Sequence, residues 1–296
     1  MNRRVLTGCG TALATPFTPD GKVDEAALRM FVEWQIGEGV HFVVPCGSTG
    51  EAATLSLEEH KRVIAITVET VAGRIAVVAG AGTNDTARAI ALTRVAKELG
   101  ATHALHVSPM YNKPPQRGIE AHFQAIAAAV DFPVVVYNVP GRTGSNIEAR
   151  TALRLSRIPN VVAIKEASGN IGQIAEILRE RPPHFGVLSG DDALTLPVMA
   201  LGGDGVISVT SNATPAAMVR LVEACAAGDF GAARVLHRAL SPWMAAAFVE
   251  ANPIPVKAAL AMLGKMHNIV RLPLVGLATA HEATVRAALA AAGALS

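Results

Sequence analysis

Val161-Val-Ala-Ile-Lys165-Glu-Ala-Ser-Gly-Asn170 is a run of β-branched and small apolar residues that ends in a single lysine and a Ser-Gly-Asn turn. Such a run is typical of a buried parallel strand, which is covered on both faces. Lys165 then lies at the carboxyl end of that strand, against apolar walls. Burial disfavours the ammonium form and lowers the pKa of a lysine, and a free amine can attack a carbonyl group to form a Schiff base. A lysine that merely ends a strand and reaches solvent is commoner. The rest of the chain is therefore needed to decide whether Lys165 is a buried, reactive amine.

Seven further strand-like runs alternate with helical patterns along the chain. Eight strands that alternate with helices predict a (β/α)8 barrel, the TIM barrel. A doubly wound open sheet is the runner-up, but Gly80-Ala-Gly82-Thr-Asn-Asp85 lacks the third glycine of a dinucleotide-binding turn. The predicted strands are 10–14, 42–45, 75–79, 104–107, 134–137, 161–165, 186–189 and 206–209, and the predicted helices between them include 24–38, 57–71, 86–99 and 147–156.

The last part of the chain has a different pattern. After about Thr214 the strands stop, and Ala-rich helical patterns follow. They exceed what the barrel needs for its last helix and predict a small C-terminal helical extension. We therefore divide the chain into a catalytic barrel domain, residues 1–228, and a C-terminal helical domain, residues 229–296. The predicted C-terminal helices are 215–227, 229–248, 256–264 and 279–293.

Composition limits the kind of partner and the compartment. The chain has 296 residues, 51% hydrophobic and 17% charged, with a net charge of +2 and no basic run. This favours neither nucleic acid nor a membrane surface as a partner. Cys9, Cys46 and Cys225 show neither disulfide nor metal spacing, which favours a reducing cytosol. The N-terminus does not have the pattern of a signal peptide, and no apolar run is long enough to span a membrane.

Residues with chemical potential follow most of the predicted strands, and a barrel carries its active site at these ends. The segments are Gly47-Ser-Thr-Gly-Glu51, Ser108-Pro-Met-Tyr111, Tyr137-Asn-Val-Pro-Gly-Arg142, Lys165, Ser189-Gly-Asp-Asp192 and Ile207-Ser-Val-Thr210. Each has a plainer interpretation: a tight loop, a core tyrosine, a surface arginine or a helix N-cap. Together they provide an amine, phenols, an anion-binding turn and a guanidinium. That set suits a 2-oxo acid, whose carboxylate would bind the Gly47–Glu51 turn and whose ketone would react with Lys165. His103 and His106 lie at strand spacing and do not indicate a metal site.

Five motifs, in order along nearly the whole chain, resemble the dihydrodipicolinate synthases. This group belongs to the class I pyruvate-dependent aldolases, which also include N-acetylneuraminate lyase. The lysine and the Gly-x-x-Gly-Glu turn indicate only the wider family, whereas the segment with Arg142 is more specific for the synthases. The motifs are Gly47-Ser-Thr-Gly-Glu51, Tyr111-Asn, Tyr137-Asn-Val-Pro-Gly-Arg142-Thr-Gly, Ile164-Lys-Glu-Ala-Ser-Gly-Asn170 and Asn252-Pro-Ile-Pro-Val-Lys257.

The resemblance implies a lyase that joins pyruvate to L-aspartate 4-semialdehyde in the diaminopimelate route to lysine. Lys165 would form the Schiff base, and Tyr137, Ser48 and Tyr111 would form a proton relay. Tyr111 would reach in from a neighbouring subunit, so that the working unit is a homodimer or a homotetramer made of two dimers. No metal or organic cofactor is implied, because the imine itself is the electron sink. Ser48 departs from the threonine that the family often has, but it keeps the hydroxyl.

The resemblance also assigns the two carboxylates and a regulatory site. The Thr49 amide and hydroxyl would hold the carboxylate of pyruvate, the Ile207 backbone would line that pocket, and Arg142 would bind the carboxylate of the semialdehyde. Gly190 is a further expected substrate-binding residue. Many family members are inhibited by lysine at a site between subunits. The matching positions here include Leu57 and Arg88, where lysine-sensitive members carry histidine and glutamate, and we therefore expect a lysine-insensitive enzyme. The matching positions run through Ala52, Ala53, Leu57, His60, Asn84 and Arg88.

Two other functions stay open at this point. The first is an aldolase or dehydratase for a sugar-derived 2-oxo acid, which would keep Lys165 and Tyr137 without needing Arg142. The second is a catalytically silent barrel that serves as a binding or regulatory protein. The presence of Lys165, Tyr137, Tyr111 and Ser48 together argues against the second.

Overall fold

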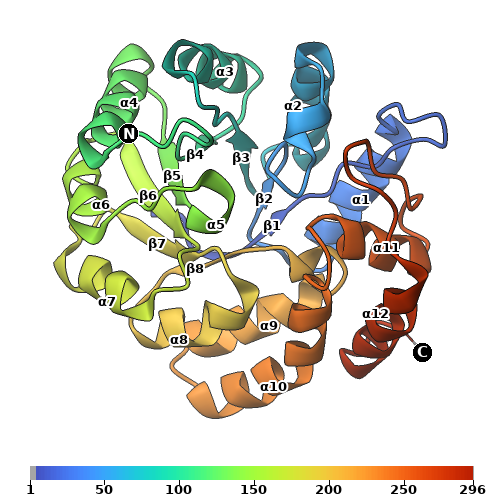
Figure 1. Cartoon of the computed structure of the whole chain (residues 1–296). Coiled ribbons are helices and arrows are strands. Elements are labelled where there is room, and N and C mark those ends of the chain that lie inside the picture. Colours follow the sequence, from blue (N-terminus) through green and yellow to red (C-terminus); the bar gives the residue numbers. More distant parts are fainter. Residues whose placement is uncertain (1–4, 296) are drawn as a thin grey trace.

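A closed barrel of eight parallel strands forms the centre of the computed structural model, which describes residues 5–295 (Figure 1). The strands pair in chain order, and β8 pairs back onto β1. This closure confirms the (β/α)8 barrel and excludes the doubly wound open sheet. The strands are β1 Gly8–Ala12, β2 Phe42–Val44, β3 Ala76–Gly80, β4 His103–Val107, β5 Val134–Asn138, β6 Val161–Glu166, β7 Gly186–Ser189 and β8 Gly205–Ser208.

Helices surround the barrel as an outer ring (Figure 1). The second helix begins at a capping box, in which the Ser56 side chain accepts from the Glu59 amide and the Glu59 carboxylate accepts from the Ser56 amide. The helices are α1 Glu25–Gly37, α2 Leu57–Val71, α3 Thr86–Glu98, α4 Gln116–Ala129, α5 Pro140–Thr143, α6 Ala149–Leu155, α7 Ile171–Glu180, α8 Thr195–Ala200 and α9 Pro215–Ala226. Short 3₁₀ helices are η1 Ala52–Thr54, η2 Asp192–Leu194 and η3 Thr210–Asn212.

The last three helices form the predicted C-terminal extension at one flank of the barrel (Figure 1). The first of them packs against α9 and the last two pack on each other. One hydrophobic cluster joins residues of β1, α1 and α2 with residues of the extension such as Trp243 and Leu289. The boundary at residue 228 stays a prediction. These helices are α10 Phe230–Ala246, α11 Ile254–Met262 and α12 Thr279–Ala291.

Most strand boundaries differ from the sequence prediction by one residue, and the first strand is shifted by two. The first strand was predicted at 10–14 and lies at Gly8–Ala12, and the eighth was predicted at 206–209 and lies at Gly205–Ser208. At the carboxyl ends of both strands, a side-chain oxygen accepts the hydrogen bond of a backbone amide that would pair with the neighbouring strand if the strand were longer. The Ala14 amide donates to Asn212 Oδ1, and the Val209 amide donates to Asp192 Oδ2. Because these side chains come from distant parts of the chain, the sequence of the strand itself does not reveal where the strand ends.

The interior of the barrel is an apolar cluster that reaches up to the carboxyl ends of the strands. It includes Leu105, Val135, Tyr137, Leu188 and Ile207. Because all strands run in parallel, the loops that follow them meet at one face of the barrel. Among residues 5–295, no helix is long and apolar enough to cross a membrane.

Candidate active site

Lys165 lies at the carboxyl end of β6, opposite Tyr137 of β5 in the strand register. The lysine is only 5% exposed. Its Nζ atom lies 4.2 Å from the centroid of the Tyr137 ring. The amine and the phenol therefore share one buried space at the catalytic face of the barrel, as the strand pattern predicted.

Burial changes the protonation of both groups. Desolvation lowers the pKa of Lys165 to about 8; the Asp192 charge partly opposes this and the Arg142 charge adds to it. Desolvation also raises the pKa of Tyr137 to about 12, with Arg142 acting in the opposite direction. Near neutral pH a useful fraction of Lys165 is a free amine, whereas Tyr137 is a neutral phenol that can both donate and accept a hydrogen bond.

Gly190 lies against the lysine stem, and Ile207 belongs to the apolar cluster inside the barrel. A Cβ atom on Gly190 would lie 2.7 Å from Ala167 Cβ and 3.0 Å from Lys165 Cε, so a larger residue would displace Ala167 or the lysine. Ile207 is fully buried on β8 and belongs to the same apolar cluster as Tyr137. Both residues thus lie at the barrel end where the sequence placed them.

The Gly47–Glu51 turn follows β2 and carries two hydroxyl side chains with different surroundings. Thr49 is buried, and its Oγ1 accepts a hydrogen bond from Asn252 Nδ2 at 2.9 Å. Ser48 is exposed. Glu51 ends the turn with a left-handed backbone, φ 53°, and its amide donates to the Ser48 carbonyl.

Arg142 lies on the short helix α5, directly after β5. Its side chain is exposed, and Nη2 donates to the Asn252 carbonyl at 3.5 Å. The guanidinium is close enough to influence the pKa values of both Lys165 and Tyr137. It therefore stands at the entrance of the site, where it can meet an incoming anion.

Tyr111 stands apart from the other predicted site residues. It lies in the loop between β4 and α4 with a left-handed backbone, φ 72°, and is 89% exposed. Within residues 5–295, no hydrogen bond or ring contact joins the phenol of Tyr111 to Lys165, Tyr137 or Ser48. A single chain thus brings together Lys165, Tyr137, Gly190 and Ile207, and leaves the Tyr111 side chain facing outward.

Asp192 is a residue whose place the sequence did not reveal. The helix N-cap that this segment was expected to contain proves to be Asp191, whose carboxylate accepts from the Ala193 amide. Asp192 instead turns inward, is fully buried, and accepts hydrogen bonds from Ser208 Oγ and from the amides of Val209 and Thr210. It fixes the end of β8 and is the buried negative charge that keeps the pKa of Lys165 from falling further.

A second group of missed residues ties the C-terminal helices to the Gly47–Glu51 turn. Lys257 Nζ donates to Glu51 Oε1 at 2.6 Å, and the two side chains are 0% and 1% exposed. The amide of Arg271 donates to the other oxygen of Glu51 at 2.9 Å. The only sequence signal for these contacts was the motif Asn252–Lys257, and it did not indicate that Lys257 pairs with Glu51.

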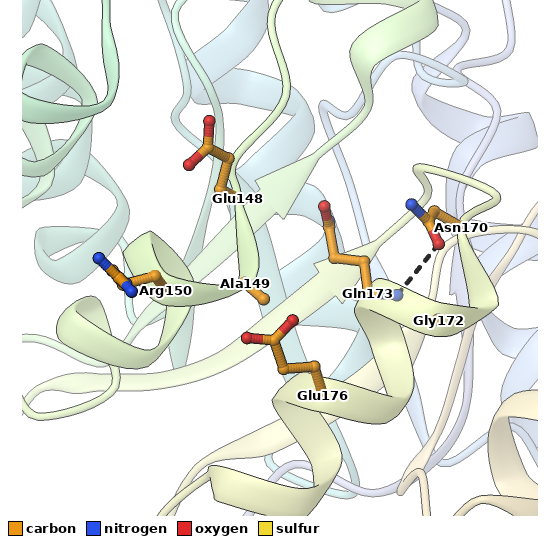
Figure 2. A pocket seen from close by; sticks show the side chains of 7 residues that line it. All are labelled: Glu148, Ala149, Arg150, Asn170, Gly172, Gln173 and Glu176. Atoms are coloured by element: carbon orange, nitrogen blue, oxygen red, sulfur yellow. Dashed lines mark hydrogen bonds between the residues drawn. The ribbon is translucent and has the colours of Figure 1, made fainter.

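An open polar hollow lies away from these residues, between the N-terminal ends of α6 and α7 (Figure 2). None of the predicted site residues lines it. We therefore assign no part of the chemistry to it. Its lining residues are Glu148, Ala149, Arg150, Asn170, Gly172, Gln173 and Glu176.

The fold and the site together define a (β/α)8 barrel with a buried, partly deprotonated lysine at the end of its sixth strand. The model of the dihydrodipicolinate synthetase family matches residues 5–292. The chain belongs to this family, which confirms the resemblance drawn from its motifs.

Individual relatives agree over nearly the full length. A protein named 4-hydroxy-tetrahydrodipicolinate synthase from Nitratidesulfovibrio vulgaris (strain DP4) is 54% identical over 98% of this chain and 99% of its own length. The crystal structure of dihydrodipicolinate synthase from Aquifex aeolicus is 45% identical and superposes with a TM-score of 0.94, covering 96% of this chain and 97% of the other. The chloride-inhibited enzyme from Acinetobacter baumannii, solved in complex with pyruvate, is 43% identical with a TM-score of 0.96, covering 98% and 99%. These relatives identify the chain as a lyase of this type.

Proposed function

We propose that this chain acts as a 4-hydroxy-tetrahydrodipicolinate synthase, which condenses pyruvate with L-aspartate 4-semialdehyde through a Schiff base on Lys165. The observation that carries the proposal is the buried Lys165 amine, with a pKa lowered to about 8, beside Tyr137 at the catalytic face of the barrel. The match to full-length synthases supports the choice of substrates.

The covalent steps follow from the chemistry of an amine and a 2-oxo acid. Lys165 Nζ attacks the pyruvate ketone, and the carbinolamine loses water to give an imine. Loss of a methyl proton then gives an enamine, whose carbon attacks the aldehyde of the second substrate. The amino group of that substrate displaces Lys165 from the imine and closes the ring. The imine is the electron sink, so the proposal requires no metal or organic cofactor.

Proton transfer falls to hydroxyl groups in this proposal. Tyr137 stays a neutral phenol because burial raises its pKa to about 12, so it can pass protons without carrying a charge. Ser48 and Tyr111 complete the relay, with Tyr111 supplied by a second subunit. General acid–base assistance of this kind is worth roughly 10²–10⁴-fold in rate.

The two substrate carboxylates would bind at different places. Thr49 receives the carboxylate of pyruvate, the Ile207 backbone lines that pocket, and Gly190 is a further substrate-binding residue. Arg142 receives the carboxylate of the semialdehyde, because a planar guanidinium can make two parallel hydrogen bonds to it. We place the enzyme in the cytoplasm, in keeping with three separate buried cysteines that are all free thiols.

A coupled assay with pyruvate and L-aspartate 4-semialdehyde tests the proposal directly. We expect product formation that requires both substrates, and little activity with a sugar-derived aldehyde in place of the semialdehyde. Preference for the sugar-derived aldehyde would favour a sugar-acid aldolase. Absence of any pyruvate-dependent imine would favour a catalytically silent barrel.

Replacing Arg142 by alanine should impair the semialdehyde step and leave imine formation nearly unchanged. Removing one partner of a desolvated charge pair costs about 2–5 kcal/mol, so kcat/KM for the aldehyde should fall by at least about tenfold. Steady-state kinetics with each substrate varied in turn measure the effect. Arg150→Ala, on the exposed face of α6, is the matched control and should change neither substrate's constants. An unchanged kcat/KM in Arg142→Ala would argue for a different second substrate.

Tyr111 should act in trans, so that two different inactive variants complement each other. Its side chain faces away from Lys165 in a single chain, and Pro114 and Pro115 stiffen the loop that carries it. Mixing Tyr111→Phe with Lys165→Ala under conditions of subunit exchange should restore part of the activity. Analytical ultracentrifugation should show a homodimer or a homotetramer. No recovery despite proven exchange would mean that the tyrosine works in cis.

L-lysine should not inhibit this enzyme. Leu57 and Arg88 are both exposed, and the positive charge of Arg88 acts on His60, where it adds to the larger effect of burial in lowering the pKa. An incoming lysine ammonium would meet this cation instead of a carboxylate, and Leu57 offers it no polar contact. Activity measured against increasing L-lysine decides the point, and strong inhibition at sub-millimolar lysine would contradict it. The double variant Arg88→Glu with Leu57→His provides the converse test, because it should make the enzyme sensitive to inhibition by L-lysine.

A further inference from the structure

Asn252 lies where the C-terminal helices meet the turn after β2, and it contacts both predicted carboxylate-binding side chains. It is 6% exposed. Its Nδ2 atom donates to Thr49 Oγ1 at 2.9 Å, across 203 positions of sequence. Its main-chain carbonyl accepts from Arg142 Nη2 at 3.5 Å. One residue thus reaches the two proposed anion sites through two different groups.

The side-chain contact determines what the Thr49 hydroxyl can do. A threonine hydroxyl has one proton to donate and two lone pairs that accept. Because the Asn252 amide occupies a lone pair, the hydroxyl proton stays available for another acceptor. Within residues 5–295 no acceptor for that proton is described. A substrate carboxylate bound at the turn would supply one.

We propose that Asn252 is a positioning residue for the substrate carboxylates, with its side chain serving the pyruvate site and its main chain serving Arg142. The side-chain amide directs Thr49 to donate its proton toward the carboxylate of the 2-oxo acid. The main-chain carbonyl steadies Arg142 independently of the side chain. This inference rests on the proposed function, because Thr49 and Arg142 receive their roles there.

The remaining contacts of the region argue against a purely structural role for Asn252. Its Oδ1 is buried and has no hydrogen-bond partner within the described chain. An unsatisfied buried acceptor costs stability, so an apolar residue would serve packing better. The mechanical link between turn and C-terminal helices is made elsewhere, by Lys257 and the Arg271 amide on Glu51. None of these groups bonds to the Thr49 hydroxyl.

Asn252→Leu keeps the branched shape of the side chain, at a larger volume, and removes the donor. We expect KM for pyruvate to rise about tenfold while KM for the aldehyde changes less than twofold, because the main-chain carbonyl remains. A general loss of packing would instead raise KM for both pyruvate and the aldehyde. An unchanged KM for pyruvate, or equal increases for the two substrates, would overturn the inference.

A double-mutant cycle with Thr49→Val tests the coupling. In the Thr49→Val background, Asn252→Leu should change KM for pyruvate less than twofold, because no hydroxyl remains to be directed; fully additive effects would contradict the proposal. Asn252→Asp provides a second variant of nearly the same shape. It can only accept, so it draws the Thr49 proton away from the substrate, and it should raise KM for pyruvate more than Asn252→Leu does.

Trapping with pyruvate and borohydride separates failure of this inference from failure of the proposed function. If the unmodified protein forms no pyruvyl adduct at Lys165, both are overturned. If it forms the adduct and Asn252→Leu binds pyruvate as well as the unmodified protein does, only the positioning role is overturned.

Discussion

Lys165→Ala should abolish the pyruvate-dependent reaction, and in the unmodified protein borohydride with pyruvate should add a reduced pyruvyl group to the peptide that contains Lys165. The reason is that Lys165 carries the buried amine with a pKa lowered to about 8. Loss of a covalent nucleophile should lower kcat by at least ~10³-fold. Peptide mass spectrometry locates the adduct, and steady-state kinetics give the loss in rate.

The matched control is Lys22→Ala, since Lys22 is an exposed lysine at 80% side-chain exposure. This variant should keep both the adduct and the rate. The trapping rate of the unmodified protein should also rise as pH increases through about 8, because only the deprotonated amine attacks the ketone. An adduct on another lysine, or a rate that rises only near the ordinary lysine pKa of 10.5, would contradict the assignment.

The barrel was predictable because its signals are local. Each strand is a short apolar run between turn residues, and Val161–Glu166 is buried at every position. The carboxyl ends of parallel strands meet at one face, so residues far apart in sequence, such as Tyr137 and Lys165, could be placed together before the structure was known. Their register on β5 and β6 bears this out.

The contacts that finish the site were not predictable, because they join distant segments through single side chains. Asn252 and Thr49 are 203 positions apart, and Lys257 and Glu51 are 206 positions apart. Which of two adjacent aspartates turns inward was also undecided by the sequence. Asp191 caps a helical turn, whereas Asp192 is buried and holds the end of β8. The proton relay through Ser48 and Tyr111 stays a prediction, since a single chain does not join these side chains.

Lys257→Met should be among the most destabilising single substitutions in this chain, because it leaves the Glu51 carboxylate buried without its cation. The two side chains are 0% and 1% exposed, and the Lys257 ammonium also donates to the Ile269 carbonyl at 2.7 Å and lies 3.9 Å from the Phe17 ring centroid. Burial lowers the pKa of Lys257 to about 8 and Glu51 opposes this, so the Lys257 side chain is largely an ammonium at neutral pH. Breaking one side of a buried pair costs about 3–5 kcal/mol.

Calorimetry or chemical denaturation of the purified variant measures that loss, and two further variants define its cause. Lys22→Met breaks the exposed pair with Asp20 and should leave the unfolding midpoint nearly unchanged, since exposed pairs contribute little. Combining Lys257→Met with Glu51→Gln should recover part of the stability, because the remaining amide carries no charge and can still accept from the Arg271 amide. If the double variant were no more stable than Lys257→Met alone, lost packing around Phe17 would explain the effect better than the unpaired charge. The link between the C-terminal helices and the Gly47–Glu51 turn would then depend on packing.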